Sequence, residues 1–194
     1  MTTIKQKIDE GRDETKRKTI FHQLLSPKAT EGHVVRNVED LTDEAFTILS
    51  AAADTTGHMM TTTAYYIISN ADIYHTLTAE LKTAFPDAAA KLDYLTLEKL
   101  PYLTAVIKEG LRLSFGVPGR LPRMIEKDEA VFNGYSVPRG TIVGMSSWLM
   151  HRDPNVFPNP DSFEPARWLD PATVGKLEKN LVAFGRGSRQ CIGM

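Results

Sequence analysis

Apolar residues recur at steps of three and four along the first half of the chain, which is the period of an amphipathic helix. This pattern predicts a long helix from about residue 42 to 69, with Thr42 able to cap its start. It also predicts a second helix over about 72–85 and a third over about 97–114. Helices are therefore expected to dominate residues 1–114.

After residue 115 the pattern changes to short β-prone segments separated by turn residues. Alternating runs flank Asn133-Gly134, a strong signal for a hairpin turn, so a small sheet is predicted over about 117–146. Four prolines lie within residues 151–170, and this segment is expected to form an irregular, ordered meander. The whole pattern predicts a mainly α fold with a small β part.

Composition narrows the choice of partners. Lys and Arg number 23 against 24 Asp and Glu, which leaves no basic field for nucleic acid. No apolar run approaches the roughly 20 residues of a transmembrane helix, and the start, residues 1–18, is charged where a signal peptide would be apolar. A hydrophobic content of 42% suits one sizeable core, so residues 1–194 are expected to form a single unit.

A turn-rich segment surrounds the single cysteine, Cys191. A thiolate that binds haem iron needs a loop close to the porphyrin and a cation for the propionates. Gly187 would allow a bend, Gly193 would remove a side chain beside the ring, and Arg189 lies two residues from the sulfur. Phe184 could shield the sulfur from water. A lone cysteine is more often a small buried hydrophobe, but these residue types at this spacing favour the haem ligand.

Residues 184–193 resemble the haem-ligand signature of the cytochrome P450 family, and every defining position of that signature is matched. The resemblance runs from about Ile20 to Met194 and is closest to fungal microsomal-type members of secondary metabolism. It implies haem b, bound through the thiolate of Cys191. It also implies the C-terminal portion of the cytochrome P450 fold, and because family members are much longer, residues 1–194 are expected to be one incomplete domain.

Glu109 and Arg112 are three residues apart in the third predicted helix and would share one face. Taken alone, they would be an exposed ion pair. They resemble the Glu-x-x-Arg motif of the family, whose partner in the meander matches Arg167. The resemblance implies a buried lock of two arginines on one carboxylate, which holds the ligand loop and does not react. An apolar stripe, expected on the opposite side of the helix, contains Leu100, Leu103, Ile107 and Leu111.

A run of small and polar residues, 51–57, interrupts the apolar pattern of the long helix, and such side chains tend to bend a helix or open a bulge. Alone, the run would more often be a small-residue helix crossing. It resembles the oxygen-binding groove of the family, in which Asp54 and Thr55 match the acid and alcohol pair that delivers protons to dioxygen. Ala51 and Ala52 become substrate-pocket candidates, and Ala52 stands where glycine is common.

Further assignments come from the same resemblance. Arg123 matches a second propionate-binding arginine, while Val117, Pro118 and Leu121 would lie over the haem beside the substrate. Two further groups are expected to have structural roles only. The first group is expected to lie in the core and consists of Met59, Met60, Tyr65 and Tyr66. The spacing of the second group fits no metal site, and it consists of His58, His75 and His151.

The resemblance implies a haem-thiolate monooxygenase that inserts one atom of dioxygen into a lipophilic small molecule, with electrons from NADPH through a reductase. The full-length parent would sit on the cytoplasmic face of the endoplasmic reticulum membrane, held by an N-terminal anchor that is expected to lie outside this chain. Two alternatives stay open. One is a haem-thiolate isomerase or dehydratase, and the other is a non-catalytic fragment unable to hold haem.

Overall fold

The chain divides into two compact units, Met1–Asp54 and Thr55–Met194, which are described separately. The structure is a computed structural model that describes residues 6, 19–26, 34–87 and 89–193. The charged start predicted from the sequence therefore lies, apart from Gln6, outside the described residues. The single domain expected over residues 1–194 stays a prediction.

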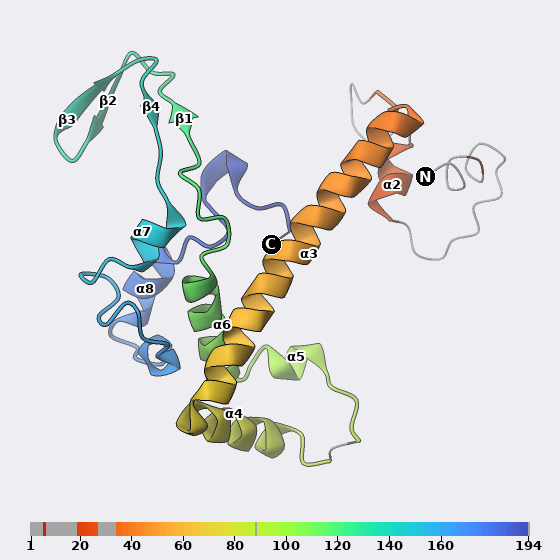
Figure 1. Cartoon of the computed structure of the whole chain (residues 1–194), viewed down its shortest axis with the longest axis vertical. Coiled ribbons are helices and arrows are strands. Elements are labelled where there is room, and N and C mark those ends of the chain that lie inside the picture. Colours follow the sequence, from red (N-terminus) through yellow and green to blue (C-terminus); the bar gives the residue numbers. More distant parts are fainter. Residues whose placement is uncertain (1–5, 7–18, 27–33, 88, 194) are drawn as a thin grey trace. The chain divides into compact units, whose positions relative to one another are not determined.

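Helices predominate and the strands are short, so the predicted mainly α fold with a small β part is confirmed (Figure 1). Within the described residues, no helix combines the length and the apolar character needed to cross a bilayer. In chain order the elements are α2 (Ile20–Leu24), α3 (Val38–Ser69), α4 (Ala71–Ala84), α5 (Tyr94–Leu97), α6 (Pro101–Ser114), β1 (Arg123–Met124), β2 (Glu129–Phe132), β3 (Tyr135–Pro138), β4 (Ile142–Val143), α7 (Ser147–His151), the 3₁₀ helix η1 (Pro165–Trp168), α8 (Val174–Asn180) and the 3₁₀ helix η2 (Gly187–Arg189).

The start of α3 differs from the prediction. Asn37 accepts a hydrogen bond from the backbone N–H of Asp40 at 2.8 Å, and so supplies the cap expected from Thr42. Thr42 lies inside the helix, where its hydroxyl donates to the carbonyl of Val38 at 2.8 Å. Residues 51–57 are exposed and α-helical without a bulge, because exposed polar side chains can bind water instead of competing for the helix backbone.

The third predicted helix, about 97–114, corresponds to α6, which begins four residues later, at Pro101. Proline has no N–H to donate, and within a helix its ring would clash with the carbonyl four residues earlier, which here belongs to Leu97. The first position of a helix tolerates both features, and Pro101 occupies that position in α6. Proline chemistry therefore places the start of this helix four residues after the position that periodicity indicated.

A carboxylate from another helix caps the start of α6. Its N-cap residue, Leu100, provides no side-chain hydrogen bond. Instead, Glu80 of α4 accepts from the N–H of Tyr102 with one oxygen and from the N–H of Leu103 with the other, both at 2.8 Å. A negative charge at a helix N-terminus also interacts favourably with the helix dipole. Glu80 thus joins α4 to α6.

The buried face of α6 is not the predicted apolar stripe. Ile107 is 42% exposed, and the three leucines of the stripe are only half-buried. Glu109 and Arg112, which spacing alone would place in an exposed ion pair, are fully buried. Their burial is tolerated because each partner is hydrogen-bonded. The buried residues of α6 are Ala105, Val106, Glu109, Gly110, Arg112, Leu113 and Ser114.

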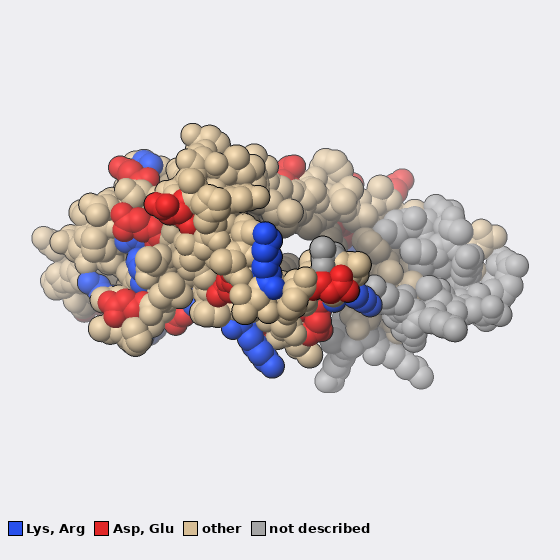
Figure 2. Space-filling view, turned by 90° about the horizontal axis from the view of Figure 1, so that it is seen from below, with Lys and Arg blue, Asp and Glu red and all other residues tan. Residues whose placement is uncertain are grey.

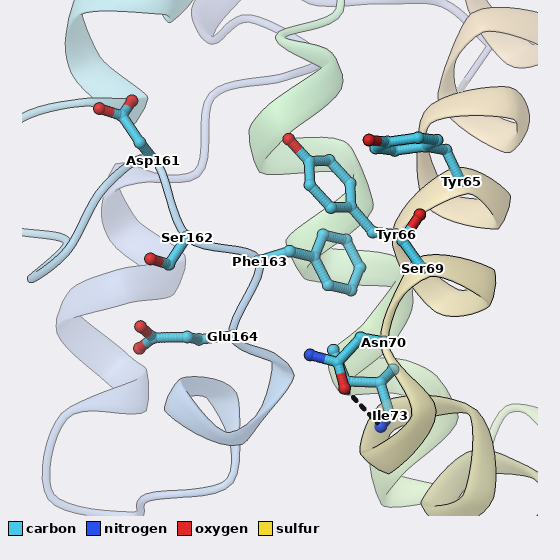
Figure 3. A pocket seen from close by; sticks show the side chains of 9 residues that line it. All are labelled: Tyr65, Tyr66, Ser69, Asn70, Ile73, Asp161, Ser162, Phe163 and Glu164. Atoms are coloured by element: carbon cyan, nitrogen blue, oxygen red, sulfur yellow. Dashed lines mark hydrogen bonds between the residues drawn. The ribbon is translucent and has the colours of Figure 1, made fainter.

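The core of the second unit forms on both sides of α6. The ring of Tyr66 stacks on that of Phe163, with centroids 4.8 Å apart, at the edge of an open pocket between the end of α3 and the meander (Figure 3). Met60 and Tyr65, predicted as core, are 63% and 65% exposed. One buried cluster contains Ile73, Leu77, Val106, Leu113 and Phe163, and the other contains Ala105, Phe157, Trp168 and Leu177.

The predicted small sheet is two separate antiparallel pairs. β2 pairs with β3, and the hairpin predicted at Asn133-Gly134 is confirmed, with φ of +48° and +84° at the two turn residues. β1 pairs with β4. Gly140, with φ of +84°, turns the chain between β3 and β4, so the hairpin ends before the second pair begins. The meander contains no strand.

The close approach of α6 to α3 generates the first prediction. A Cβ on Gly110 would lie 2.0 Å from Thr63 Oγ1. Gly110→Ala is therefore expected to lower the free energy of unfolding by about 1–3 kcal/mol, because the helices must separate. Urea denaturation followed by circular dichroism measures the change.

Gly57→Ala is the matched control, since a Cβ at this exposed position of α3 would meet nothing within 4 Å. This substitution is expected to stabilise by about 0.5–1 kcal/mol. If both substitutions stabilised the chain, the tight contact at Gly110 would be disproved.

Candidate functional site

The carboxylate of Glu109 is fully buried and accepts five hydrogen bonds. One oxygen accepts from Arg112 Nη2 at 2.8 Å, Arg167 Nε at 3.1 Å and the backbone N–H of Glu164 at 2.9 Å. The other accepts from Arg112 Nε at 2.9 Å and the indole of Trp168 at 2.8 Å. The carboxylate is thereby saturated, and it joins α6 to η1.

Arg112 is also fully buried, and its remaining N–H groups reach into the meander. Its Nη1 donates to the carbonyls of His151 at 2.9 Å and Pro160 at 2.6 Å, and its Nη2 donates to the carbonyl of Ser162 at 2.9 Å. With the two bonds to Glu109, all five guanidinium donors are used. A segment without regular pairing is thus held by one side chain.

Arg167 lies at the edge of this cluster and binds the segment that precedes η1. Its Nη1 donates to the carbonyl of Pro158 at 2.8 Å, and its Nη2 donates to Glu164 Oε2 at 3.2 Å. Neither Trp168 nor the carbonyl partners were predicted. Two signals existed: a buried indole N–H needs an acceptor, and a proline-rich segment leaves carbonyls that need donors.

His151, predicted to be structural, connects this cluster to the segment before the cysteine. It is fully buried, and its Nε2 accepts the backbone N–H of Val182 at 2.9 Å. Because an N–H can only donate, Nε2 carries no proton, and Nδ1–H donates to the carbonyl of Arg112 at 2.8 Å. Burial lowers the pKa of His151 from 6.5 to about 4.

Cys191 lies in an exposed loop whose backbone bends at glycines. Gly185 and Gly187 have φ of +70° and +81°, a conformation that L side chains rarely adopt, and the bend at Gly187 was predicted. The N–H of Cys191 donates to the carbonyl of Phe184 at 2.8 Å, which closes the loop. A Cβ on Gly193 would lie 3.7 Å from Cys191 Sγ, so the absence of a side chain keeps the sulfur accessible.

The two arginines predicted near the haem both have exposed side chains. Arg189 ends η2 within the cysteine loop. Arg123 begins β1, and its Nη1 donates to the carbonyls of Leu121 at 3.1 Å and Pro122 at 2.9 Å. These bonds orient Arg123 along its own segment and do not join it to the cysteine loop.

The substrate-pocket candidates after α6 are exposed apolar residues on a backbone held by serines. The hydroxyl of Ser147 donates to the carbonyl of Val117 at 3.2 Å, and the hydroxyl of Ser146 donates to that of Pro118. Leu121 has φ of +46°, which is unusual for a leucine. A fixed backbone with outward apolar side chains is suited to contacting a lipophilic molecule.

The candidates on α3 lie where the two compact units meet in the sequence. Ala51, Ala52, Asp54 and Thr55 are all exposed. Their placement beside a cofactor stays a prediction.

On the face drawn in Figure 2, acidic and basic side chains are interspersed among uncharged ones. A nucleic-acid backbone requires an extended positive field. Interspersed charges on this face produce no such field.

Removal of the buried carboxylate gives the second prediction. Glu109→Ala leaves Arg112 buried without its counter-charge and is expected to lower the free energy of unfolding by about 3–5 kcal/mol. Arg167→Lys keeps the charge but loses the planar fork, so a smaller loss of about 1–2 kcal/mol is expected. Urea denaturation measures both.

The exposed pair Arg139–Asp128, with side chains 69% and 95% accessible, provides the control. Arg139→Ala is expected to cost less than about 1 kcal/mol. An equally small cost for Glu109→Ala would refute the structural weight given to the cluster.

The third prediction concerns the stability of the folded chain at acidic pH. Between about pH 6.5 and pH 4 the unfolded chain binds a proton at His151 while the folded chain does not, so stability falls as the pH is lowered through this window. The full contribution, about 3 kcal/mol, is present above the window. Urea denaturation at several pH values should show this slope, and His151→Gln should remove it. His75→Gln, at an exposed position of α4, should leave the slope in place.

Comparisons with known proteins give one consistent result. The cytochrome P450 family model matches residues 1–194. The cytochrome P450 monooxygenase macH of Penicillium terrestre is 42% identical over 178 residues, which are 91% of this chain and 35% of that protein. The N-acetyltryptophan 6-hydroxylase ivoC of Emericella nidulans is 39% identical over 180 residues, again 91% and 35%. The chain spans about a third of the length of these curated relatives. It belongs to the cytochrome P450 family.

Proposed function

We propose that the protein is a haem-thiolate monooxygenase in which Cys191 is the ligand of the haem iron. The observation that carries this proposal is the position of the only cysteine, exposed in a loop bent by glycines and closed by its own N–H bond to Phe184. A sulfur presented in this way is accessible to a metal.

The residues around Cys191 fit a haem. Gly193 leaves the space beside the sulfur free of a side chain, so a flat ring can approach it. Arg189 and Arg123 have exposed guanidinium groups that can pair with the two propionates. When bound, haem would supply the activation of dioxygen, with electrons from NADPH through a reductase.

The protein's own part would be to bind the substrate and to move protons. Val117, Pro118 and Leu121 would contact a lipophilic small molecule, while the small side chains of Ala51 and Ala52 would leave room for it. The carboxylate of Asp54 would take a proton from water and pass it on through the hydroxyl of Thr55, which can donate and accept.

The relatives indicate the class of substrate. Their names include monooxygenases of several fungi and a hydroxylase of N-acetyltryptophan. We therefore expect hydroxylation of a lipophilic small molecule of secondary metabolism. The location would be the cytoplasmic face of the endoplasmic reticulum membrane, which rests on the likeness to fungal family members.

The fourth prediction tests the ligand. The chain is mixed with haem, reduced and exposed to carbon monoxide, and the expected result is the red-shifted Soret band typical of a thiolate ligand. Cys191→Ser should lose this band while its far-ultraviolet circular dichroism stays unchanged. The substitution is conservative because the side chain is exposed and its backbone N–H bond remains.

Three outcomes separate the alternatives. Absence of haem uptake would favour a non-catalytic fragment, and an unchanged spectrum in Cys191→Ser would exclude thiolate ligation by this residue. Where the band appears, oxygen consumption with NADPH and a reductase distinguishes a monooxygenase from a haem-thiolate isomerase or dehydratase, which uses no external electrons.

A further inference from the structure

Two contacts fix the backbone immediately before the Cys191 loop. The N–H of Val182 donates to His151 Nε2 at 2.9 Å. The carbonyl of Ala183 passes so close to Gly116 that a Cβ there would lie 2.2 Å from the carbonyl oxygen. The entrance to the loop is therefore held by one hydrogen bond to His151, the last residue of α7, and by one contact that requires glycine just beyond the end of α6.

His151 is itself held firmly enough to serve as an anchor. Its Nδ1–H donates to the carbonyl of Arg112, and the guanidinium of Arg112 donates back to the carbonyl of His151, at 2.8 and 2.9 Å. The rings of Phe115 and Phe157 contact the imidazole, with centroid distances of 6.3 and 6.2 Å. Such packing leaves the ring one orientation, and that orientation presents Nε2 to Val182.

Short links carry this restraint to the cysteine. The carbonyl of Val182 accepts the N–H of Gly185 at 2.9 Å, which makes the first turn of the loop. The carbonyl of Phe184, inside that turn, accepts the N–H of Cys191. The bonds from Arg112 through His151 and Val182 thus reach the residue that carries the thiol.

We propose that neutral His151 is a positioning residue that holds the entrance of the Cys191 loop against α6. The role of the loop as the haem-ligand segment rests on the proposed function, whereas the contacts of His151 do not. The histidine would act through Val182 and Phe184, without touching haem or substrate.

Protonation would release this anchor. A protonated Nε2 cannot accept from Val182, and the new charge would lie beside the guanidinium of Arg112. The charged groups packed around the ring are Arg112 and Glu109 from α6, with Arg167 from η1 bound to Glu109 and the guanidinium of Arg152 over the Phe115 ring. The carboxylate of Glu109 is already saturated by its five donors, so it offers an imidazolium no further bond.

The fifth prediction uses amide hydrogen exchange of the haem-free 194-residue chain, read at Val182 and at Val106 as a reference within α6. At pH 7 the Val182 amide should be protected. As the pH falls from about 6 to 4, its protection relative to Val106 should drop by at least about tenfold, because the acceptor is lost.

Three variants separate positioning from general stability. His151→Phe keeps a ring without hydrogen bonds and should expose Val182 at every pH while Val106 stays protected. His151→Gln supplies an acceptor and a donor, so it should keep Val182 protected and remove the acid dependence. His75→Gln should behave as the unchanged chain does.

Two results would overturn the proposal: Val182 protection that survives in His151→Phe, or an acid dependence that persists in His151→Gln. If His151→Phe fails to fold, the glutamine variant and the pH series still decide. A missing thiolate spectrum together with a protected Val182 amide would count against the proposed function alone. An unprotected Val182 amide with an intact thiolate spectrum would count against the positioning role of His151 alone.

Discussion

The second compact unit depends on one buried charge. A carboxylate removed from water is costly unless donors surround it, and Glu109 accepts from two arginines, an indole and a backbone N–H. Most of these donors belong to the meander, a segment with no strand and only one 3₁₀ turn of its own. The meander keeps its shape because Glu109 and Arg112 hydrogen-bond its backbone groups, which in a sheet would be paired with a neighbouring strand.

α6 is the element through which this constraint spreads. Its start is capped by Glu80, its C-terminal half carries the buried ion pair, and Gly116, just beyond its end, meets Ala183. Small residues make these approaches possible, since Gly110 admits Thr63 of α3. The segment before the cysteine loop is therefore held at His151 and just beyond the end of α6, although the loop itself is exposed.

The sequence predicted those helices and turns that depend on residues close together along the chain. Periodicity located α3, α4 and α6 to within a few residues, and Asn133-Gly134 located the hairpin because that dipeptide favours positive φ at both positions. α6 begins at Pro101 because proline is tolerated in the first turn of a helix and not in its interior. The apolar pattern alone does not reveal this start. The buried face of α6 was predicted wrongly for a different reason. Periodicity assigns charged residues to the solvent-exposed face, whereas Glu109 and Arg112 form an ion pair in the core.

Long-range bonds to the backbone were beyond sequence reasoning. The partners of Arg112 and His151 are carbonyl and N–H groups, which every residue possesses and no residue type signals. The candidate residues around Cys191 came from their types and spacing, which the family resemblance then supported, whereas the triad of Glu109, Arg112 and Arg167 came from that resemblance alone. The bond from His151 to Val182, 31 positions apart, had no counterpart in any motif.

The cap that Glu80 places on α6 also bears on how the helices form. A peptide containing α6 alone would begin with unsatisfied N–H groups at Tyr102 and Leu103, and helices of this length are marginal in water. The missing carboxylate comes from only 22 residues upstream, so closing the intervening loop costs little entropy. α4 and α6 are consequently a cooperative helical pair, in which each helix gains order from the other.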